Sequence, residues 1–451
     1  MKKKYNDKFD KMANAPVKPL ITSLAIPTIA TMLVSALYNM ADSFFVGKID
    51  TSSVAAVGIV FSVMTLLQAV GFFLGHGSGI LISTLLGKKD KSTAKIYANT
   101  AFFISVIAGI ILAAVGLIFS EEIAVMLGAG ATTKAAAASY LKYVLLGSPF
   151  MLGSFVLNNQ LRYQGSAVYS MFGIVSGSIL NIALDPLFIF TFKMGVNGAA
   201  IATVISQAVG LTVLIFGTLK NENIRLSIKY FKPNKKILFN ICKNGIASLS
   251  RQGIQTVATI CLNFASKPYG DAAVAGMSVF NRVMFFGFAV VIGIGQGFQP
   301  VCSFNDGAKK YDRVYEGYKF ITVVSTIYIT AVSVLAFIFA SQLIAVFRDD
   351  GKVVEIGARA LRYQCFAMPV LGYCTASNML AQSLKLPGRA TVLALARQGI
   401  FYIPLILLLP KITGIEGITL AQPLADILSF ILTLFLTIPV IKNIKTKIRK
   451  N

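Results

Sequence analysis

Twelve apolar runs, each long enough to cross a lipid bilayer, constrain this 451-residue chain more than any other feature. A transmembrane helix needs about 20 predominantly apolar residues. The chain is 55% hydrophobic and only 13% charged, against about 25% charged residues in an ordinary soluble domain. This composition excludes a typical globular enzyme and predicts an all-α membrane protein with twelve transmembrane helices. We place the spans at 20–46, 54–84, 96–119, 137–160, 166–191, 195–219, 237–265, 272–304, 319–346, 353–384, 388–410 and 414–440.

Lysine and arginine lie mainly on alternate loops. The formal net charge is +24, but the basic residues do not gather on one face or domain, as they do in nucleic-acid-binding proteins, so we expect no nucleic-acid partner. With the N-terminus placed inside, the inside segments hold 29 Lys and Arg and the outside segments hold 7. This bias satisfies the positive-inside rule and predicts that both termini are cytoplasmic. The basic tail KNIKTKIRKN is expected to touch anionic membrane lipid.

The chain carries five cysteines and one histidine. All five cysteines lie in or beside apolar runs and none forms a CxxC motif. We interpret them as packing residues, because a free cysteine behaves as a small hydrophobic residue. A metal or disulfide framework is not predicted, and His76 alone cannot make a histidine-rich metal site.

The two halves of the sequence repeat each other. GHGSG at 75–79 aligns with GIGQG at 293–297, and LKYVLLGSP at 141–149 aligns with LRYQCFAMP at 361–369. We therefore predict an N-terminal six-helix lobe at 1–219, a basic cytoplasmic linker at 220–236 and a C-terminal six-helix lobe at 237–451. Because each lobe has an even number of spans, the two bundles are parallel, pseudo-symmetric repeats, an arrangement found in some secondary transporters.

The glycine triplets are not expected to bind a nucleotide. A dinucleotide-binding GxGxxG loop follows a strand, whereas these glycines lie inside apolar runs. Close packing of helices, or local flexibility, explains them better. No GxxxxGK[ST] motif is present, so ATP is not the expected source of energy.

Three helices of the N-terminal lobe carry polar residues inside the membrane, where an ionisable side chain is by default a candidate for function. Residues three or four apart share a helix face, which pairs Asn39 with Asp42, Asn181 with Asp185, and Thr203 with Gln207. If these stripes converge, two carboxylates with amide and hydroxyl oxygens form a pocket that takes up a proton or binds Na⁺. In the alternative interpretation each aspartate caps a proline kink or pairs with a basic residue.

The C-terminal lobe has a different set of polar residues. The position that aligns with Asp185 falls near Leu405 and holds no acid. Arg397 or Arg282 could neutralise Asp426, so ion coupling is predicted to be confined to the N-terminal lobe. The intramembrane polar residues of this lobe are Arg251, Gln252, Arg282, Arg397, Gln422 and Asp426.

The motifs YNMADSFFVGKIDTSSVAAVG, LRYQGSA and NIALDPLFIF, on twelve spans in two lobes, resemble the multidrug and toxic compound extrusion (MATE) family. SRQG in span 7 is similar to its DinF/MepA-like bacterial branch. The resemblance implies a secondary active antiporter that exports cationic or amphiphilic drugs in exchange for H⁺ or Na⁺. It implies a multi-pass monomer in the bacterial cytoplasmic (inner) membrane that needs no cofactor. It implies a cation site at Asp42, Asn181, Asp185 and Thr203, where Na⁺ could bind. The substrate cavity is expected to include Asn39, Tyr140, Asn158, Gln207, Arg251 and Gln252.

Two other functions compete with drug export. A flippase for lipids or lipid-linked glycans shares the two-lobe architecture and should line its cavity with cationic residues that hold phosphate. A membrane-embedded protease would use paired aspartates, but nothing else in the sequence supports one, so we expect that the protein is not an enzyme.

Overall fold

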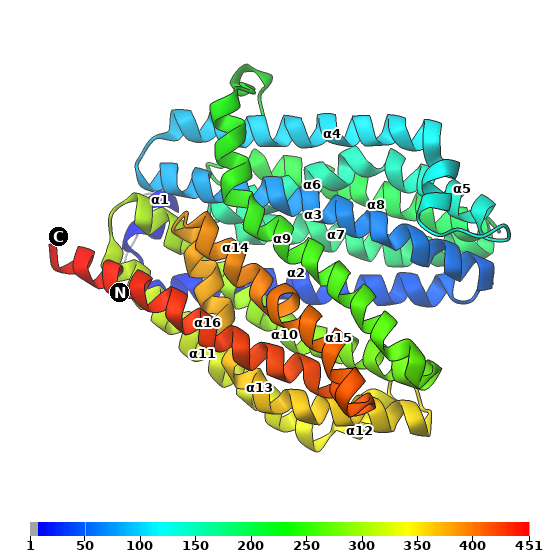
Figure 1. The fold of residues 1–451 in the computed structure, drawn as a ribbon. Coiled ribbons are helices and arrows are strands. Elements are labelled where there is room, and N and C mark those ends of the chain that lie inside the picture. Colours follow the sequence, from blue (N-terminus) through cyan, green and yellow to red (C-terminus); the bar gives the residue numbers. More distant parts are fainter. Residues whose placement is uncertain (1–7, 50, 451) are drawn as a thin grey trace. The chain divides into compact units, whose positions relative to one another are not determined.

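The computed structural model describes residues 8–49 and 51–450, apart from the side chains of 39, 43 and 51–54, and within this part the fold is entirely helical (Figure 1). Twelve long helical elements follow the short helix α1 (Lys8–Asn14). Six fall in the first half: α2 (Val17–Val46), α3 (Thr51–Gly87), α4 (Lys91–Met126), the pair α5 (Lys134–Leu146) and α6 (Ser148–Tyr163), α7 (Ala167–Pro186) with η1 (Leu187–Thr191), and α8 (Gly195–Thr218).

Six more elements follow the linker, which contains η2 (Ile228–Tyr230). They are α9 (Lys235–Ser266) with η3 (Lys267–Tyr269), α10 (Asp271–Gly307), α11 (Tyr311–Ile338) with α12 (Ala340–Ala345), α13 (Gly351–Ser383), α14 (Pro387–Leu395) with η4 (Ala396–Phe401) and α15 (Tyr402–Thr413), and α16 (Ile415–Lys450).

Each predicted span corresponds to one of these elements, which confirms the predicted fold class. Nine helices within the described residues are long and apolar enough to cross a membrane. The pair α5 and α6, bent by 48°, adds a tenth candidate. The two remaining elements, α9 and α13, are more polar because charged residues such as Arg251 and Arg359 lie within them.

The chain divides into two compact units, and the division falls inside two helices. The first unit contains the described part of Met1–Ala15 together with Ala30–Leu249; the second contains Pro16–Ile29 and Ser250–Asn451. The start of α2 therefore belongs to the second unit, and the start of α9 belongs to the first. The lobe bounds at 219 and 237 stay a prediction about the sequence repeat.

Glycines of the repeated motif allow the starts of α2 and α9 to pack closely within the unit to which each belongs. In the first unit, a Cβ on Gly77 would overlap the backbone carbonyl of Ile241 in α9. In the second unit, a Cβ on Gly297 would lie 2.6 Å from the Cα of Ala25 in α2. Real Cβ atoms do not approach backbone so closely, so these positions need glycine. The prediction that the triplets serve helix packing is confirmed.

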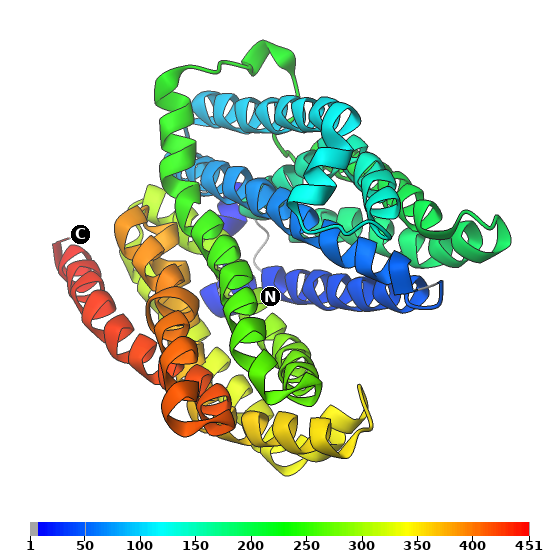
Figure 2. The same cartoon turned by 45° about the vertical axis from the view of Figure 1, so that its right-hand side comes forward.

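The linker is fixed to the first unit by side chains of α4. Oδ1 of Asn99 accepts the backbone N–H of Ser227 at 2.7 Å, and the hydroxyl of Thr100 accepts that of Lys232 at 3.1 Å. These bonds satisfy backbone donors that have no helical partner. Figure 2 shows the segment following the last helix of the first half and leading into α9.

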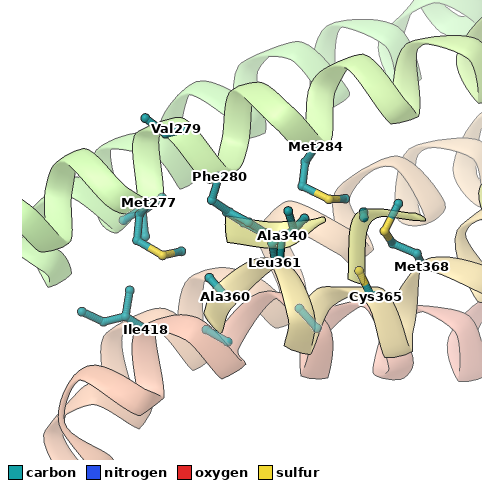
Figure 3. Close-up of a cluster of buried hydrophobic side chains, with 14 of the residues drawn as sticks. Met277, Val279, Phe280, Met284, Ala340, Ala360, Leu361, Cys365, Met368 and Ile418 are labelled. Atoms are coloured by element: carbon teal, nitrogen blue, oxygen red, sulfur yellow. The ribbon is translucent and has the colours of Figure 1, made fainter. Parts of the chain in front are cut away.

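The second unit has an apolar core between α10, α13 and α16. Figure 3 shows Phe280 and Met284 of α10 directed toward Leu361, Cys365 and Met368 of α13. The burial of Cys365 in this cluster agrees with its prediction as a packing residue. The five cysteines are unpaired.

Candidate functional site

Three helices of the first unit bring two aspartates together. Asp42 lies on α2, and Asp185 lies at the end of α7, where its carboxylate is fully buried. The two groups are close enough for the charge of one to act on the other. Asp185 precedes Pro186 and the π-helical turn η1. Proline removes a backbone donor from the helix, and π-helical turns often occur at functional sites.

Asn181 connects Asp185 to Thr203 through hydrogen bonds. With its amide nitrogen facing the acid, Asn181 donates to Oδ2 of Asp185 at 2.9 Å. Its Oδ1 then accepts from the backbone N–H of Thr203 at 3.2 Å and from the Thr203 hydroxyl at 3.3 Å. Both residues are nearly fully buried. Three of the four residues predicted as a cation site are therefore joined by hydrogen bonds between α7 and α8, and the charge of the fourth, Asp42 on α2, acts on Asp185.

Two tyrosines complete this group, which we call the two-acid cluster: Tyr38, Asp42, Tyr140, Asn181, Asp185 and Thr203. The Tyr38 hydroxyl hydrogen-bonds to the Thr203 side chain and lies near both acids. Tyr140 of α5 is fully buried near Asp42 and Asp185. Within the described residues, its hydroxyl and Oδ1 of Asp42 are buried without a hydrogen-bond partner.

The two-acid cluster has carboxylate, amide and hydroxyl oxygens but no basic side chain paired with either acid among the described residues. Hard monovalent and divalent cations prefer such oxygen ligands. Two interacting carboxylates can also share a proton, and then titrate as a pair. The arrangement can therefore hold an exchangeable cation, either Na⁺ or H⁺.

A cavity of about 820 Å³, part of it open to solvent, adjoins this cluster. Tyr38, Asn181 and Thr203 belong to both the cavity wall and the two-acid cluster. The remaining lining residues are Ser35, Phe61, Met64, Thr65, Gln68, Met151, Ser154, Phe155, Gly173, Ile174, Gly177, Ser178, Ser206, Gln207 and Gly210.

The residues predicted for the substrate cavity have different positions in the structure. Gln207 lines the cavity, and Tyr140 lies beside the acids. Asn158 is instead buried between α6 and α7, where its amide donates to the backbone carbonyl of Ser170 at 3.0 Å and to the Ser170 hydroxyl at 2.7 Å.

Three further residues were predicted for the substrate cavity. The side chain of Asn39 lies outside the described part of the chain. Arg251 and Gln252 lie on the part of α9 that belongs to the second unit, and they are not among the lining residues.

Sequence reasoning missed Tyr38 and Gln68. Tyr38 precedes Asp42 by four residues, so the i,i+4 spacing that paired Asn181 with Asp185 was also present here. Gln68 lies three residues after Thr65, so the two share a face of α3, and both line the cavity.

The second unit holds a different polar group, which we call the arginine cluster: Asp426, Arg397, Gln364 and Gln422. Asp426 is fully buried on α16. Nε of Arg397 donates to its Oδ1 at 2.8 Å, Nε2 of Gln422 donates to Oδ1 at 3.0 Å, and Nε2 of Gln364 donates to Oδ2 at 2.6 Å. Of the two arginines predicted as partners, Arg397 is the one that forms the pair, and Arg282 is exposed.

Comparisons with known proteins agree with this architecture. The MatE family model matches residues 27–187 and 249–408, once in each half. Multidrug export protein MepA of Staphylococcus aureus (strain MRSA252) is 28% identical over 414 residues, which covers 91% of each chain. The protein of the same name from Staphylococcus haemolyticus (strain JCSC1435) is 27% identical over 414 residues, with the same coverage.

Solved structures share the fold. A structure described as the outward-facing conformation of a multidrug resistance MATE family transporter of the MOP superfamily superposes with a TM-score of 0.91. It is 24% identical and covers 98% of this chain and 100% of its own. A MATE structure in the straight conformation gives the same TM-score, identity and coverage.

Proposed function

The chain belongs to the MatE family, whose model matches both of its halves, and from this membership we propose that it is a secondary active multidrug transporter that exports cationic or amphiphilic compounds in exchange for H⁺ or Na⁺. The curated relatives are named as multidrug export proteins. The single observation that carries the exchange mechanism is the wall shared by the two-acid cluster and the cavity.

Shared residues provide a physical link between ion and drug. Asn181 donates to Asp185, Thr203 bonds to Asn181 and to Tyr38, and all three residues line the cavity. A cation that binds the acids changes the charge and the hydrogen bonds behind this wall. A cationic drug in the cavity is then held less strongly, and reciprocity requires that the drug weakens ion binding equally. Alternating access of the two lobes would convert this antagonism into exchange.

The chemistry of the cavity favours cationic or amphiphilic cargo. Its described lining combines Phe61, Met64, Met151 and Phe155 with neutral polar side chains and contains no Lys or Arg. Met and aromatic side chains adapt to varied apolar shapes and aromatic faces attract cations. A lipid or lipid-linked glycan flippase, the alternative function, would need basic residues to hold phosphate. Among the intramembrane arginines of the C-terminal lobe, Arg397 is already paired with Asp426.

We further propose that the protein is a multi-pass monomer of the bacterial cytoplasmic membrane. The excess of Lys and Arg on alternate loops supports cytoplasmic positions for both termini. The named relatives come from bacteria. We assign transport rather than catalysis to the chain, and no cofactor beyond the coupling ion.

Asp42→Asn tests the proposal directly. In everted vesicles that contain the variant, we expect that uptake of a cationic dye no longer responds to an imposed H⁺ or Na⁺ gradient. Glu122→Gln, an exposed acid at the far end of α4, is the matched control and should keep the response. Separate H⁺ and Na⁺ gradients identify the coupling ion. Wild-type dye uptake by Asp42→Asn would refute the role of Asp42.

A further inference from the structure

The carboxylate of Asp426 in the second unit is saturated by three donors. Oδ1 accepts from Arg397 and Gln422, and Oδ2 accepts from Gln364, all within 3.0 Å. The side chain of Asp426 has no exposed surface, whereas that of Arg397 keeps 22%. An unpaired charge at such a depth would be strongly unfavourable. The guanidinium therefore supplies the positive charge that this acid requires.

A π-helical turn and an aromatic ring position the guanidinium of Arg397. Arg397 lies in the π-helical turn η4, and its guanidinium carbon is 4.7 Å from the centroid of the Phe288 ring. Arginine is well suited to buried pairs because its fork is planar and its charge is permanent. The cation cannot leave, because the same chain holds it.

One oxygen beside the pair is left without a partner. Gln364 is fully buried, and among the described residues its Oε1 accepts no hydrogen bond while its Nε2 binds Asp426. The hydroxyl of Thr433 and the thiol of Cys374 lie next to each other, and Asp426 and Arg397 act on that thiol. Amide groups thus donate to Asp426, as the amide of Asn181 donates to Asp185 in the first unit, and Gln364 Oε1 adds an unpartnered oxygen beside the acid.

We propose that the arginine cluster is a built cation site whose permanent occupant is the guanidinium of Arg397, and that removing this guanidinium opens the site to a small monovalent cation, Na⁺ or H⁺. The second unit then holds a cation that is part of its own chain. This inference concerns the charge at Asp426 alone, and it holds whether or not the chain exports drugs.

The test uses the purified full chain in detergent and follows thermal unfolding, which requires no transport. Arg397→Met removes the charge and keeps an apolar stem. Its thermal midpoint should rise by about 2 °C or more when Na⁺ replaces choline over a hundredfold range, or when the pH is lowered, because a ligand that binds only the folded state stabilises it. The Na⁺ and pH series distinguish the two cations.

Two matched variants test whether the shift of the thermal midpoint with Na⁺ or pH arises at Asp426. Arg397→Lys keeps a tethered cation and should respond no more than the wild type. Arg397→Met combined with Asp426→Asn should lose the added response, because the acid is gone. The proposal is overturned if Arg397→Met and this double variant respond alike, or if Arg397→Lys responds as strongly as Arg397→Met.

The proposal can still be tested if Arg397→Met folds poorly. Arg397→Gln serves as a second uncharged variant, with monodispersity on size exclusion as the measure of folding. Recovery of either variant only in high Na⁺ or at low pH would support the latent site. Failure of both to fold in every ionic condition, while the Asp426→Asn double variant folds, would contradict it.

Discussion

The two units use a buried carboxylate in opposite ways. The two-acid cluster of the first unit has two aspartates and no basic partner among the described residues, whereas the arginine cluster of the second unit has one aspartate bound by a guanidinium. In both, amide side chains donate to the acid. The difference shows that a repeated scaffold can keep amide donors beside a buried acid and change whether a basic side chain pairs with that acid.

The scaffold itself is much more alike in the two units. Gly77 and Gly297, from the aligned glycine motifs, each face the backbone of a helix whose other part belongs to the other unit. In each half the fifth spanning helix contains a π-helical turn, η1 or η4, next to a functional candidate. The two units therefore share their helix packing but differ in the charges that they bury.

The largest expected effect is on transport. Asp185→Asn should reduce ion-driven efflux of a cationic dye by about tenfold or more, the scale of a strong coupling between two sites. Efflux from loaded proteoliposomes under an imposed gradient measures it. If Asp185→Asn keeps wild-type efflux, Asp185 is not needed for coupling. Its proposed functional difference from Asp426 would then be refuted.

The next effect is on stability. Asp426→Ala leaves the Arg397 guanidinium without its acid and should destabilise the protein by about 3–5 kcal/mol. Asp42→Asn should cost far less, because no described basic side chain depends on Asp42. Thermal unfolding in detergent compares the two. Combining Asp426→Ala with Arg397→Met should recover most of the loss, and equal losses from Asp42→Asn and Asp426→Ala would contradict the contrast.

The shared packing should respond alike in both units. Gly77→Ala and Gly297→Ala each force a methyl group against backbone, and each should destabilise by about 1–3 kcal/mol. Gly253→Ala is the control, because a Cβ there meets no atom within 4 Å. We expect it to be neutral or to stabilise by up to about 1 kcal/mol, the difference in helix propensity. Sensitivity in one unit only would show that the scaffold is not equivalent.

The smallest effect concerns a helix cap outside the membrane. Oδ1 of Asp90 accepts the backbone N–H of Thr93 at 3.0 Å at the start of α4, and this hydrogen bond lowers the pKa of its carboxyl. The corresponding cap of α11 is Lys310, which cannot accept such a bond. Asp90→Ala should cost about 1 kcal/mol.

The sign of its pH dependence follows from the lowered pKa. Because the folded state holds the proton less tightly than the unfolded state, the contribution of Asp90 is complete above the unfolded pKa of about 3.9 and is lost as the pH falls through the folded value. Thermal unfolding of the wild type and Asp90→Ala should therefore converge in acid. A constant gap between them at every pH would refute the capping role.

Local patterns in the sequence were sufficient for the helices and for half of the site. Apolar runs located every long element, because membrane helices need a continuous apolar length. The spacing of Asn181 and Asp185 put both on one face of α7, and their hydrogen bond follows from it. The pair between Arg397 and Asp426 was open to prediction because few buried groups could balance that acid.

What could not be predicted depends on contacts between distant segments. Nothing local in the sequence shows that α2 and α9 are each divided between two units. Asn158 faces Ser170 rather than the cavity because α6 packs on α7 at that level. The π-helical turns next to Asp185 and Arg397 likewise arise from packing and proline effects that hydropathy does not record.

The central claim is that the acids of the first unit bind the cation that opposes the drug. The most direct measurement is the affinity of the purified protein for a cationic dye, titrated at several Na⁺ concentrations and several pH values. The wild type should bind the dye more weakly, by about tenfold, as the coupling ion becomes saturating, and Asp185→Asn should bind it with an affinity that no longer depends on that ion. An ion dependence in Asp185→Asn equal to that of the wild type would contradict the account.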